Sequence, residues 1–242
     1  MNRNDKQAYD RGTSLFSPDG RIYQVEYARE AVKRGAPVVG VRTTDGVVLV
    51  GQRSSPSPLM ETESIEKIHK LDDHLGAASA GHVADARKLI DFARTTAQRE
   101  RLRYGEPIDV EVLTKAITDN IQESTQSGGT RPYGASLLIG GVENGTPRLF
   151  ATDPSGTPQE WRAVAIGGMR NDIQDALEAG YTDDLTLDDG VSLALSALRT
   201  ANDELTAEEV DVVKLSADGY SQLDKDAIAD AFADAAPDED EA

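Results

Sequence analysis

Segments with strand and helix patterns come in blocks along this chain, and their order constrains the fold more than any other feature. β-Branched runs either side of residues 44–46, and two further strand-like runs either side of the Asn-Gly pair at 144–145, predict two hairpins. After each of the first two runs of strands come two segments whose apolar residues recur at helical spacing. A parallel sheet would need strands and helices in alternation, so this order predicts antiparallel hairpins stacked as two sheets with helices outside.

The expected elements can be bounded from the same patterns. Strands are expected over residues 37–43, 46–51, 65–71, 75–80, 135–142, 147–152, 160–166, 210–215 and 220–223. Helices are expected from Val83 to about Arg103, from Val110 to just before Gly128, and over residues 171–180, 187–202 and 225–232. No linker-like stretch interrupts residues 13–233, which predicts a single domain, and residues 234–242 are expected to form an acidic, disordered tail.

A polar segment, a turn and one amphipathic helix make up residues 9–35. Residues 17–20 (SPDG) have the composition of a tight turn, in which proline presets φ and glycine tolerates positive φ. The apolar residues that follow share one helical face: Ile22, Val25, Ala28 and Val32. They predict a helix over about residues 20–34, which Gly35 is expected to end in the manner of a C-terminal glycine.

The charge of this stretch differs from that of the whole chain. The protein has 43 Asp and Glu against 25 Lys and Arg, a formal net charge of −18, while residues 1–35 carry seven positive and five negative side chains. A local positive patch suits an anionic partner group, but a helix with solvated ion pairs would have the same composition. From charge alone both interpretations stay open.

Acidity is spread along the chain, and only eight of the cations are lysines. This favours a halophile's cytoplasm, where salt screens self-repulsion, over acidity that serves solubility alone. Nucleic-acid binding is not expected, because phosphate neutralisation needs clustered cations. No apolar run approaches the length of a membrane span and residues 1–20 lack the apolar core of a signal peptide, so a soluble cytoplasmic protein is expected.

Familiar catalytic motifs are not found. The three histidines, His69, His74 and His82, do not have the spacing of metal ligands, and no cysteine is present. Neither a phosphate loop nor the nucleophile elbow of serine hydrolases can be identified. From the residues alone, no metal, no cofactor and no catalytic site is expected.

Six short segments nevertheless form a specific combination. They are Tyr9-Asp10-Arg11, FSPDGR at 16–21, QVEYA at 24–28, SIEKI at 64–68, GHVADAR at 81–87 and RPYG at 131–134. Together they resemble the α subunits of the proteasome core particle, most of all the archaeal ones, over about residues 6–232. The resemblance implies an α+β fold: a four-layer αββα sandwich of the N-terminal-nucleophile hydrolase type with an additional N-terminal helix. That architecture agrees with the block order.

The resemblance also implies that the chain is non-catalytic. In the catalytic β subunits of this family the first strand begins with a threonine whose hydroxyl and free amine are nucleophile and base. The matching position here is near Ala36, inside the chain. The catalytic carboxylate of the β subunits falls near Gln52, although Lys67 remains at about the position of the β lysine. Threonine endopeptidase activity would then reside in partner β subunits.

Two other classes of protein remain as alternatives. An autoprocessed, β-like N-terminal-nucleophile hydrolase would be cleaved before residue 36, although Ala36 offers no hydroxyl. A stand-alone binding module would use the basic helix. The mass of the mature N-terminus tests the first alternative, and the size of the particle in high salt tests the second.

The resemblance further implies that the chain forms heptameric outer rings with other α subunits, and that these rings lie on rings of β subunits. The outer rings would gate an axial channel for unfolded protein substrates. They would also dock the C-terminal tails of an AAA ATPase activator. Residues 1–12 would be the mobile gate tail. The implied gate residues are Tyr9, Asp10, Arg11, Pro18 and Tyr27. The implied activator-binding residues are Lys67, Gly35, Gly81, His82, Pro18, Gly20, Glu26 and Arg29, with Lys67 facing the terminal carboxylate.

The pore constriction would be bordered by Ser127, Gly128 and Gly129. Two of the implied site residues depart from the family pattern. His82 stands where close archaeal relatives usually have leucine, which would change the apolar wall of the docking pocket. Ser127 stands where a tyrosine commonly precedes the glycines, which would change the pore entrance.

Overall fold

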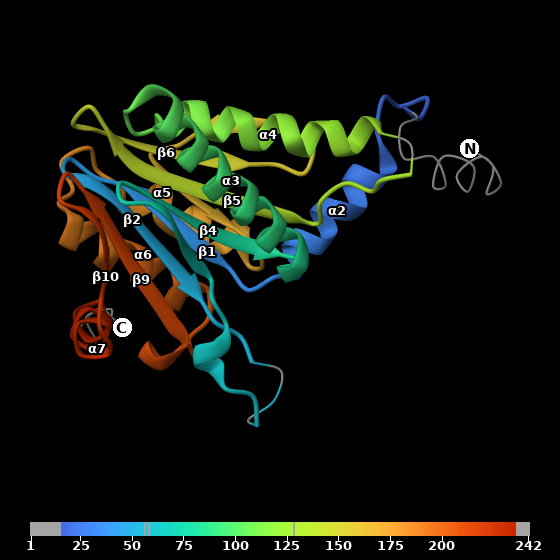
Figure 1. Cartoon of the computed structure of the whole chain (residues 1–242). Coiled ribbons are helices and arrows are strands. Elements are labelled where there is room, and N and C mark those ends of the chain that lie inside the picture. Colours follow the sequence, from blue (N-terminus) through green and yellow to red (C-terminus); the bar gives the residue numbers. More distant parts are fainter. Residues whose placement is uncertain (1–15, 56, 58, 128, 236–242) are drawn as a thin grey trace.

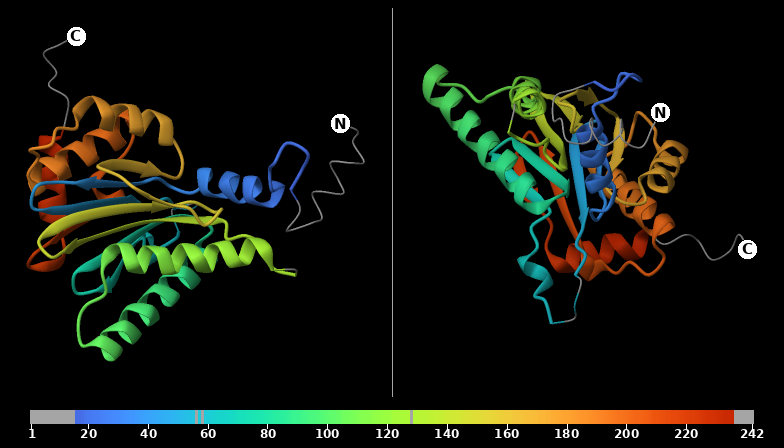
Figure 2. Two further views of the ribbon diagram at one scale, coloured as in Figure 1. Left: turned by 90° about the horizontal axis from the view of Figure 1, so that it is seen from above. Right: turned by 90° about the vertical axis from the view of Figure 1, so that its right-hand side faces the viewer.

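Two five-stranded antiparallel sheets lie face to face, with helices on both outer sides (Figures 1 and 2). The computed structural model describes residues 16–55, 57, 59–127 and 129–235. The strands are β1 Val38–Arg42, β2 Gly46–Gln52, β3 Ile68–Asp72, β4 Leu75–Gly81, β5 Ala135–Glu143, β6 Thr146–Thr152, β7 Pro158–Glu160, β8 Ala163–Ile166, β9 Val210–Ser216 and β10 Gly219–Gln222. The first sheet has the order β10-β9-β2-β1-β8 and the second the order β3-β4-β5-β6-β7.

Helices come in pairs between the strand blocks, as the sequence predicts. The described α-helices are α2 Tyr23–Lys33, α3 Val83–Tyr104, α4 Val110–Gln126, α5 Arg170–Gly180, α6 Leu187–Ala201 and α7 Lys225–Asp234; short 3-10 turns lie at Thr62–Ser64 and Ala207–Glu209. None of the described helices is both long enough and apolar enough to cross a bilayer. The result is the expected αββα sandwich with an N-terminal helix.

Successive side chains of a strand point to opposite faces of the sheet, so each strand contributes to two different apolar cores. In β1, Val39 and Val41 pack with α5 and α6, whereas Val38 packs between the two sheets with Leu138 and Leu149. A further apolar cluster joins the second sheet to α3 and α4. Because both faces of each sheet are covered, a central strand such as β2 is buried along its whole length.

Helix α2 lies at one end of the sandwich, beyond the strands (Figure 2). Its expected apolar face is confirmed, since Val25, Ala28 and Val32 are buried. The helix is shorter than the predicted 20–34, because the preceding turn delays its start to Tyr23. The prediction that Gly35 ends the helix through a left-handed backbone is wrong: Gly35 does not have positive φ, and the residue after the helix, Arg34, keeps right-handed dihedral angles.

The strand predicted over residues 160–166 is also wrong, because it is two strands in different sheets. β7 pairs with β6 in the second sheet, whereas β8 pairs with β1 in the first. The chain crosses between the sheets at Trp161 and Arg162, and no glycine or proline there marks the change of partner. The predicted hairpin at 144–145 is confirmed, with positive φ at both Asn144 and Gly145.

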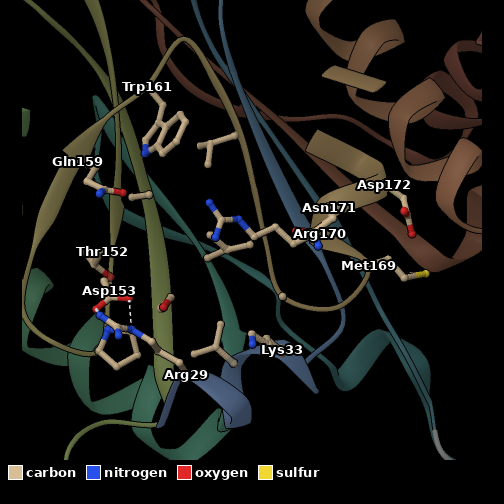
Figure 3. A pocket seen from close by; sticks show the side chains of 17 residues that line it. Arg29, Lys33, Thr152, Asp153, Gln159, Trp161, Met169, Arg170, Asn171 and Asp172 are labelled. Atoms are coloured by element: carbon tan, nitrogen blue, oxygen red, sulfur yellow. Dashed lines mark hydrogen bonds and ion pairs between the residues drawn. The ribbon is translucent and has the colours of Figure 1, made fainter. Parts of the chain in front are cut away.

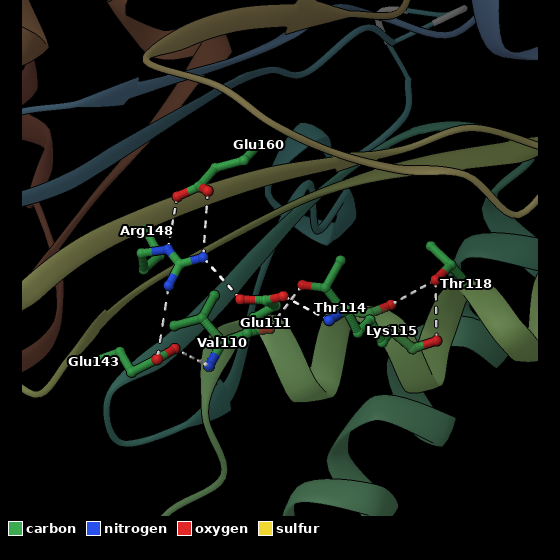
Figure 4. A network of polar contacts seen from close by, with 8 residues as sticks. All are labelled: Val110, Glu111, Thr114, Lys115, Thr118, Glu143, Arg148 and Glu160. Atoms are coloured by element: carbon green, nitrogen blue, oxygen red, sulfur yellow. Dashed lines mark hydrogen bonds and ion pairs between the residues drawn. The ribbon is translucent and has the colours of Figure 1, made fainter.

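A charged network holds the start of α4 to the second sheet. The Arg148 guanidinium on β6 lies 2.6 Å from Glu160, 3.0 Å from Glu111 and 3.7 Å from Glu143 (Figure 4). Glu143 also accepts the Val110 N–H at 3.0 Å, at the first residue of α4. The hydrogen bond to Glu160, together with Glu111 and Glu143, raises the pKa of Arg148. One arginine therefore contacts three carboxylates at this junction.

Candidate functional site

Two glycines meet where α2 and β4 end. A Cβ on Gly35 would lie 2.3 Å from the nitrogen of Gly81, and a Cβ on Gly81 would lie 2.3 Å from the carbonyl oxygen of Gly134. Gly81 also has φ of 105°, which other residues rarely adopt. The Gly35 carbonyl accepts the N–H of Gly168, just beyond β8, at 2.8 Å. The end of α2 therefore touches both sheets at a place where only glycine leaves enough room.

A groove of about 620 Å³ opens beside this contact. Its lining residues are Tyr27, Glu30, Ala31, Arg34, Gly35, Gly81 and His82. We call it the glycine groove. It brings together four of the residues singled out by the sequence, Tyr27, Gly35, Gly81 and His82, although they come from α2 and from the far end of β4.

Lys67 adjoins the groove through Ala36 but does not line it. Its Nζ donates a hydrogen bond to the Ala36 carbonyl oxygen at 3.1 Å, and its side chain passes close to Gly51, where a Cβ would lie 2.9 Å from the Lys67 Cβ. Burial lowers the pKa of Lys67 to about 8.

Lys67 also differs from most other lysines in its partners. Five described lysines form ion pairs with carboxylates: Lys33, Lys70, Lys115, Lys214 and Lys225. The Lys67 ammonium has three donors, and the described chain offers it one neutral carbonyl and no carboxylate. It therefore keeps the capacity to bind an anion.

The residues around Ala36 lack the groups of an N-terminal nucleophile. Ala36 is an internal residue with a methyl side chain, and its carbonyl is the acceptor for Lys67. Gln52 is buried, its backbone N–H donates to the Pro37 carbonyl at 3.0 Å, and its side-chain oxygen has no hydrogen-bond partner in the described part of the chain. An amide does not ionise, so this arrangement supplies neither a nucleophile nor an acid.

Glu26 and Arg29 belong to a different face of α2 and do not line the glycine groove. Arg29 donates to both carboxylate oxygens of Asp153, at 3.0 and 2.9 Å (Figure 3). It also donates to Glu26 at 2.7 Å. Burial opposes the effect, but Arg29 and Ser155 together lower the pKa of Asp153. At these positions the positive charge of α2 is therefore already paired, in agreement with the ion-pair interpretation of its composition.

Asp153 is a site residue that the sequence interpretation missed. It follows β6 directly, and a carboxylate placed after a strand was the only available signal. Its partner Arg29 is 124 positions earlier in the chain, so composition could not connect them.

Pro18 and Gly20 lie in the turn before α2, as predicted. The Gly20 N–H donates to the Ser17 carbonyl at 2.8 Å, and Gly20 has φ of 74° with free space around it. The Ser17 hydroxyl accepts the Arg21 N–H at 3.1 Å, which closes the turn. Neither Pro18 nor Gly20 lines the groove.

Ser127 and Gly129 follow the end of α4, at the same end of the molecule as α2 (Figures 1 and 2). Ser127 is exposed, and its hydroxyl donates to the Glu123 carbonyl at 2.9 Å. Gly129 has φ of 88°. The remaining candidates, Tyr9, Asp10, Arg11 and Gly128, lie outside the described residues.

An ion pair joins two of the sequence motifs. The Arg131 guanidinium donates to both oxygens of Asp85, at 2.6 and 2.9 Å, and the Gly134 N–H donates to the same carboxylate at 2.9 Å. Burial opposes the shift, but Arg131 and Gly134 together lower the pKa of Asp85. Because Gly134 also accepts the His82 N–H, at 2.7 Å, this pair fixes the backbone that surrounds Gly81.

Comparison with known proteins agrees with this geometry. The proteasome subunit family model matches residues 32–215, and the model of the N-terminal signature of A-type proteasome subunits matches residues 9–31. The proteasome alpha 2 subunit of Haloferax volcanii is 76% identical over 239 residues, covering 99% of this chain and 96% of that protein. The proteasome alpha subunit of Haloquadratum walsbyi is 62% identical over 232 residues, covering 95% and 93%. The chain therefore belongs to the proteasome α-subunit family, and its relatives are haloarchaeal.

Proposed function

We propose that this chain is a non-catalytic ring subunit that gates the proteasome core particle and docks an ATPase activator. Seven copies or close homologues would form each outer ring on rings of β subunits, which would supply the threonine endopeptidase activity. Unfolded proteins would pass through the axial channel for ATP-dependent degradation. The location would be the cytoplasm.

The unpaired ammonium of Lys67 beside the glycine groove is the observation that carries this proposal. A peptide tail lying in the groove would bring its backbone against Gly35 and Gly81, where side chains are excluded. Its terminal carboxylate could then supply the missing counter-charge at Lys67. A hydrogen bond between charged groups of this kind contributes about 1.5 to 3 kcal/mol.

The other assigned residues would surround that tail from neighbouring positions. Pro18, Gly20, Glu26 and Arg29 would line the side that receives the penultimate tyrosine of the tail. His82 would replace an apolar wall with an imidazole. These assignments predict weaker packing for an apolar tail residue at His82 than a leucine would give.

Gating would depend on a cluster that includes Tyr9, Asp10, Arg11, Pro18 and Tyr27. A tyrosine hydroxyl and a carboxylate can exchange hydrogen-bond partners between adjacent subunits, which gives two discrete arrangements of residues 1–12. Ser127, Gly128 and Gly129 would border the pore constriction below the gate.

Substitution of Lys67 by alanine tests the docking role. In particles assembled with β subunits, Lys67→Ala should abolish stimulation by the ATPase while the unstimulated hydrolysis of short peptides persists. Lys88→Ala is the matched control, because Lys88 is an exposed lysine on α3 and the substitution removes the same charge. The control should be stimulated like the unmodified particle.

Unchanged stimulation of the Lys67→Ala particle would remove Lys67 from the carboxylate role. A separate measurement tests the non-catalytic assignment: the purified chain alone should form rings and cleave no peptide. Hydrolysis by the chain alone that a threonine-directed inhibitor blocks would contradict it.

A further inference from the structure

A second cavity, of about 480 Å³, lies on the other side of α2 from the glycine groove (Figure 3). It is enclosed by α2, by the ends of β6, β7 and β8, and by the first turn of α5. Its polar and charged lining includes Arg29, Lys33, Ser136, Asp153, Arg170 and Asp172. Of its lining residues, only Arg29 has a role in the function proposed above.

The apolar part of the cavity is built around the single tryptophan of the chain. Trp161 lies where the chain crosses between the sheets, half-buried, and its indole N–H is buried without a hydrogen-bond partner in the described residues. Val32, Val164 and Ile166 continue the apolar surface. A flat apolar group could therefore be buried here against an aromatic ring.

The charged part of the cavity contains one arginine that is not neutralised. Arg29 is held by Asp153 and Glu26, and Lys33 by Glu30 at 2.6 Å. Arg170 makes no ion pair or hydrogen bond through its side chain in the described structure, and Figure 3 shows its guanidinium extending into the cavity below Trp161.

Arg170 is also the first residue of α5, an 11-residue helix whose N-terminus is not capped by a side chain. The N-cap residue, Met169, has φ of 52° and lines the cavity. The first N–H groups of a helix have no partner within the helix, and they carry partial positive charge. The guanidinium and these N–H groups each favour an anion, and Asp172 in the same first turn is the carboxylate that opposes one.

An unpartnered hydroxyl on a largely buried residue provides an independent sign of a ligand site. Ser136 is only 4% exposed and lines the cavity, yet its hydroxyl forms no hydrogen bond with the described residues. A serine hydroxyl has one donor and two acceptor sites, so it can form hydrogen bonds with a bound molecule. Here the open side of the hydroxyl is the cavity.

We propose that this cavity binds an organic anion with a flat apolar body, such as an aromatic carboxylate or sulfonate. The anionic group binds at Arg170 and the first turn of α5, and the apolar body lies against Trp161. Among the cations of the lining, Arg170 is the one without a carboxylate partner in the described structure. The inference does not depend on the proposed gating and docking role.

The test uses 1-anilinonaphthalene-8-sulfonate, an aromatic sulfonate that accepts excitation energy from tryptophan. Because Trp161 is the only tryptophan, energy transfer to the dye reports binding near this cavity. The full chain, assembled in its ring and held at constant high KCl, should show saturable transfer. The uncharged analogue N-phenyl-1-naphthylamine should bind more weakly, because it lacks the group that Arg170 would hold.

Arg170→Gln should weaken dye binding about tenfold or more, the loss expected for a hydrogen bond between charged groups. Arg162→Gln is the matched control: Arg162 adjoins Trp161 and its substitution removes the same charge, but it pairs with Asp183 outside the cavity. The control should bind the dye like the unmodified ring. Equal affinity of the two variants, equal affinity for the uncharged analogue, or no transfer in the assembled ring would each overturn the proposal.

Discussion

The contact of Gly81 with Gly134 permits a quantitative test of the glycine groove. In Gly81→Ala, the new Cβ would lie 2.3 Å from the Gly134 carbonyl oxygen, so the backbone must move. Holding a non-glycine residue at left-handed dihedral angles costs about 1 to 2 kcal/mol. Overpacking costs about 1 to 3 kcal/mol more. We therefore expect Gly81→Ala to lower the free energy of unfolding by about 2 to 5 kcal/mol, the sum of these two costs.

Gly105→Ala is the matched control for this substitution. Gly105 also has positive φ, of 76°, but nothing lies within 4 Å of its Cβ position. It should lose only the dihedral contribution of about 1 to 2 kcal/mol. Chemical unfolding followed by the fluorescence of Trp161, at one KCl concentration and one protein concentration, measures both variants on the same scale.

The difference between the two variants decides the outcome. Equal destabilisation would show that the Gly134 carbonyl moves aside without cost, and the steric account of the groove would then be wrong. A larger effect at Gly81 should be accompanied by loss of ATPase stimulation, since the same backbone forms the floor of the groove.

Three further predictions concern charged groups. Arg131→Gln should lower the free energy of unfolding by about 1.5 to 3 kcal/mol near neutral pH. Because the folded pKa of Asp85 is lowered, the stability that this carboxylate contributes is present above its unfolded pKa and is lost as pH falls through its folded pKa. The thermal unfolding of the variant and of the unmodified protein should therefore converge in acid. Arg148→Met should cost about 1.5 to 3 kcal/mol, whereas Arg162→Met, which breaks one exposed pair, should cost at most about 1 kcal/mol in the same thermal measurement. The affinity of an activator-tail peptide, measured by calorimetry, should fall as pH rises through about 8, because Lys67 then loses its proton, and Lys67→Arg should remove this pH dependence.

The layered fold could be predicted from sequence because its signals are local. Strands and helices can be told apart by the spacing of their apolar residues and by turn residues such as Asn144-Gly145. The order of strand and helix segments along the chain then indicates how they are layered. The exchange of sheets at Trp161 could not be predicted, since β7 and β8 are both extended and the pairing partner of a strand is a long-range property. Their partners, β6 and β1, are decided by packing, and no local residue marks the switch.

The candidate site divides in the same way. Gly35, Gly81, His82 and Tyr27 could be selected from short motifs, but their meeting around one groove depends on how α2 docks on two sheets. The helix ends just before Gly35, as predicted, but without a left-handed glycine, because a helix-ending glycine and a glycine needed for close approach look alike in sequence. The partners of α2 arginines depend on residues such as Asp153, far away in the chain.

The contact between Gly35, Gly81 and Gly168 makes α2 behave as a short lever. With 11 residues the helix is about 16 Å long, so a tilt of about 5° around this contact would displace its first residue, Tyr23, by only about 1.5 Å. Larger displacements of the chain before Tyr23 must therefore come from the turn at Gly20, which has free space around it. A ligand bound in the glycine groove would act at this contact, and the turn at Gly20 would allow the chain before α2 to move.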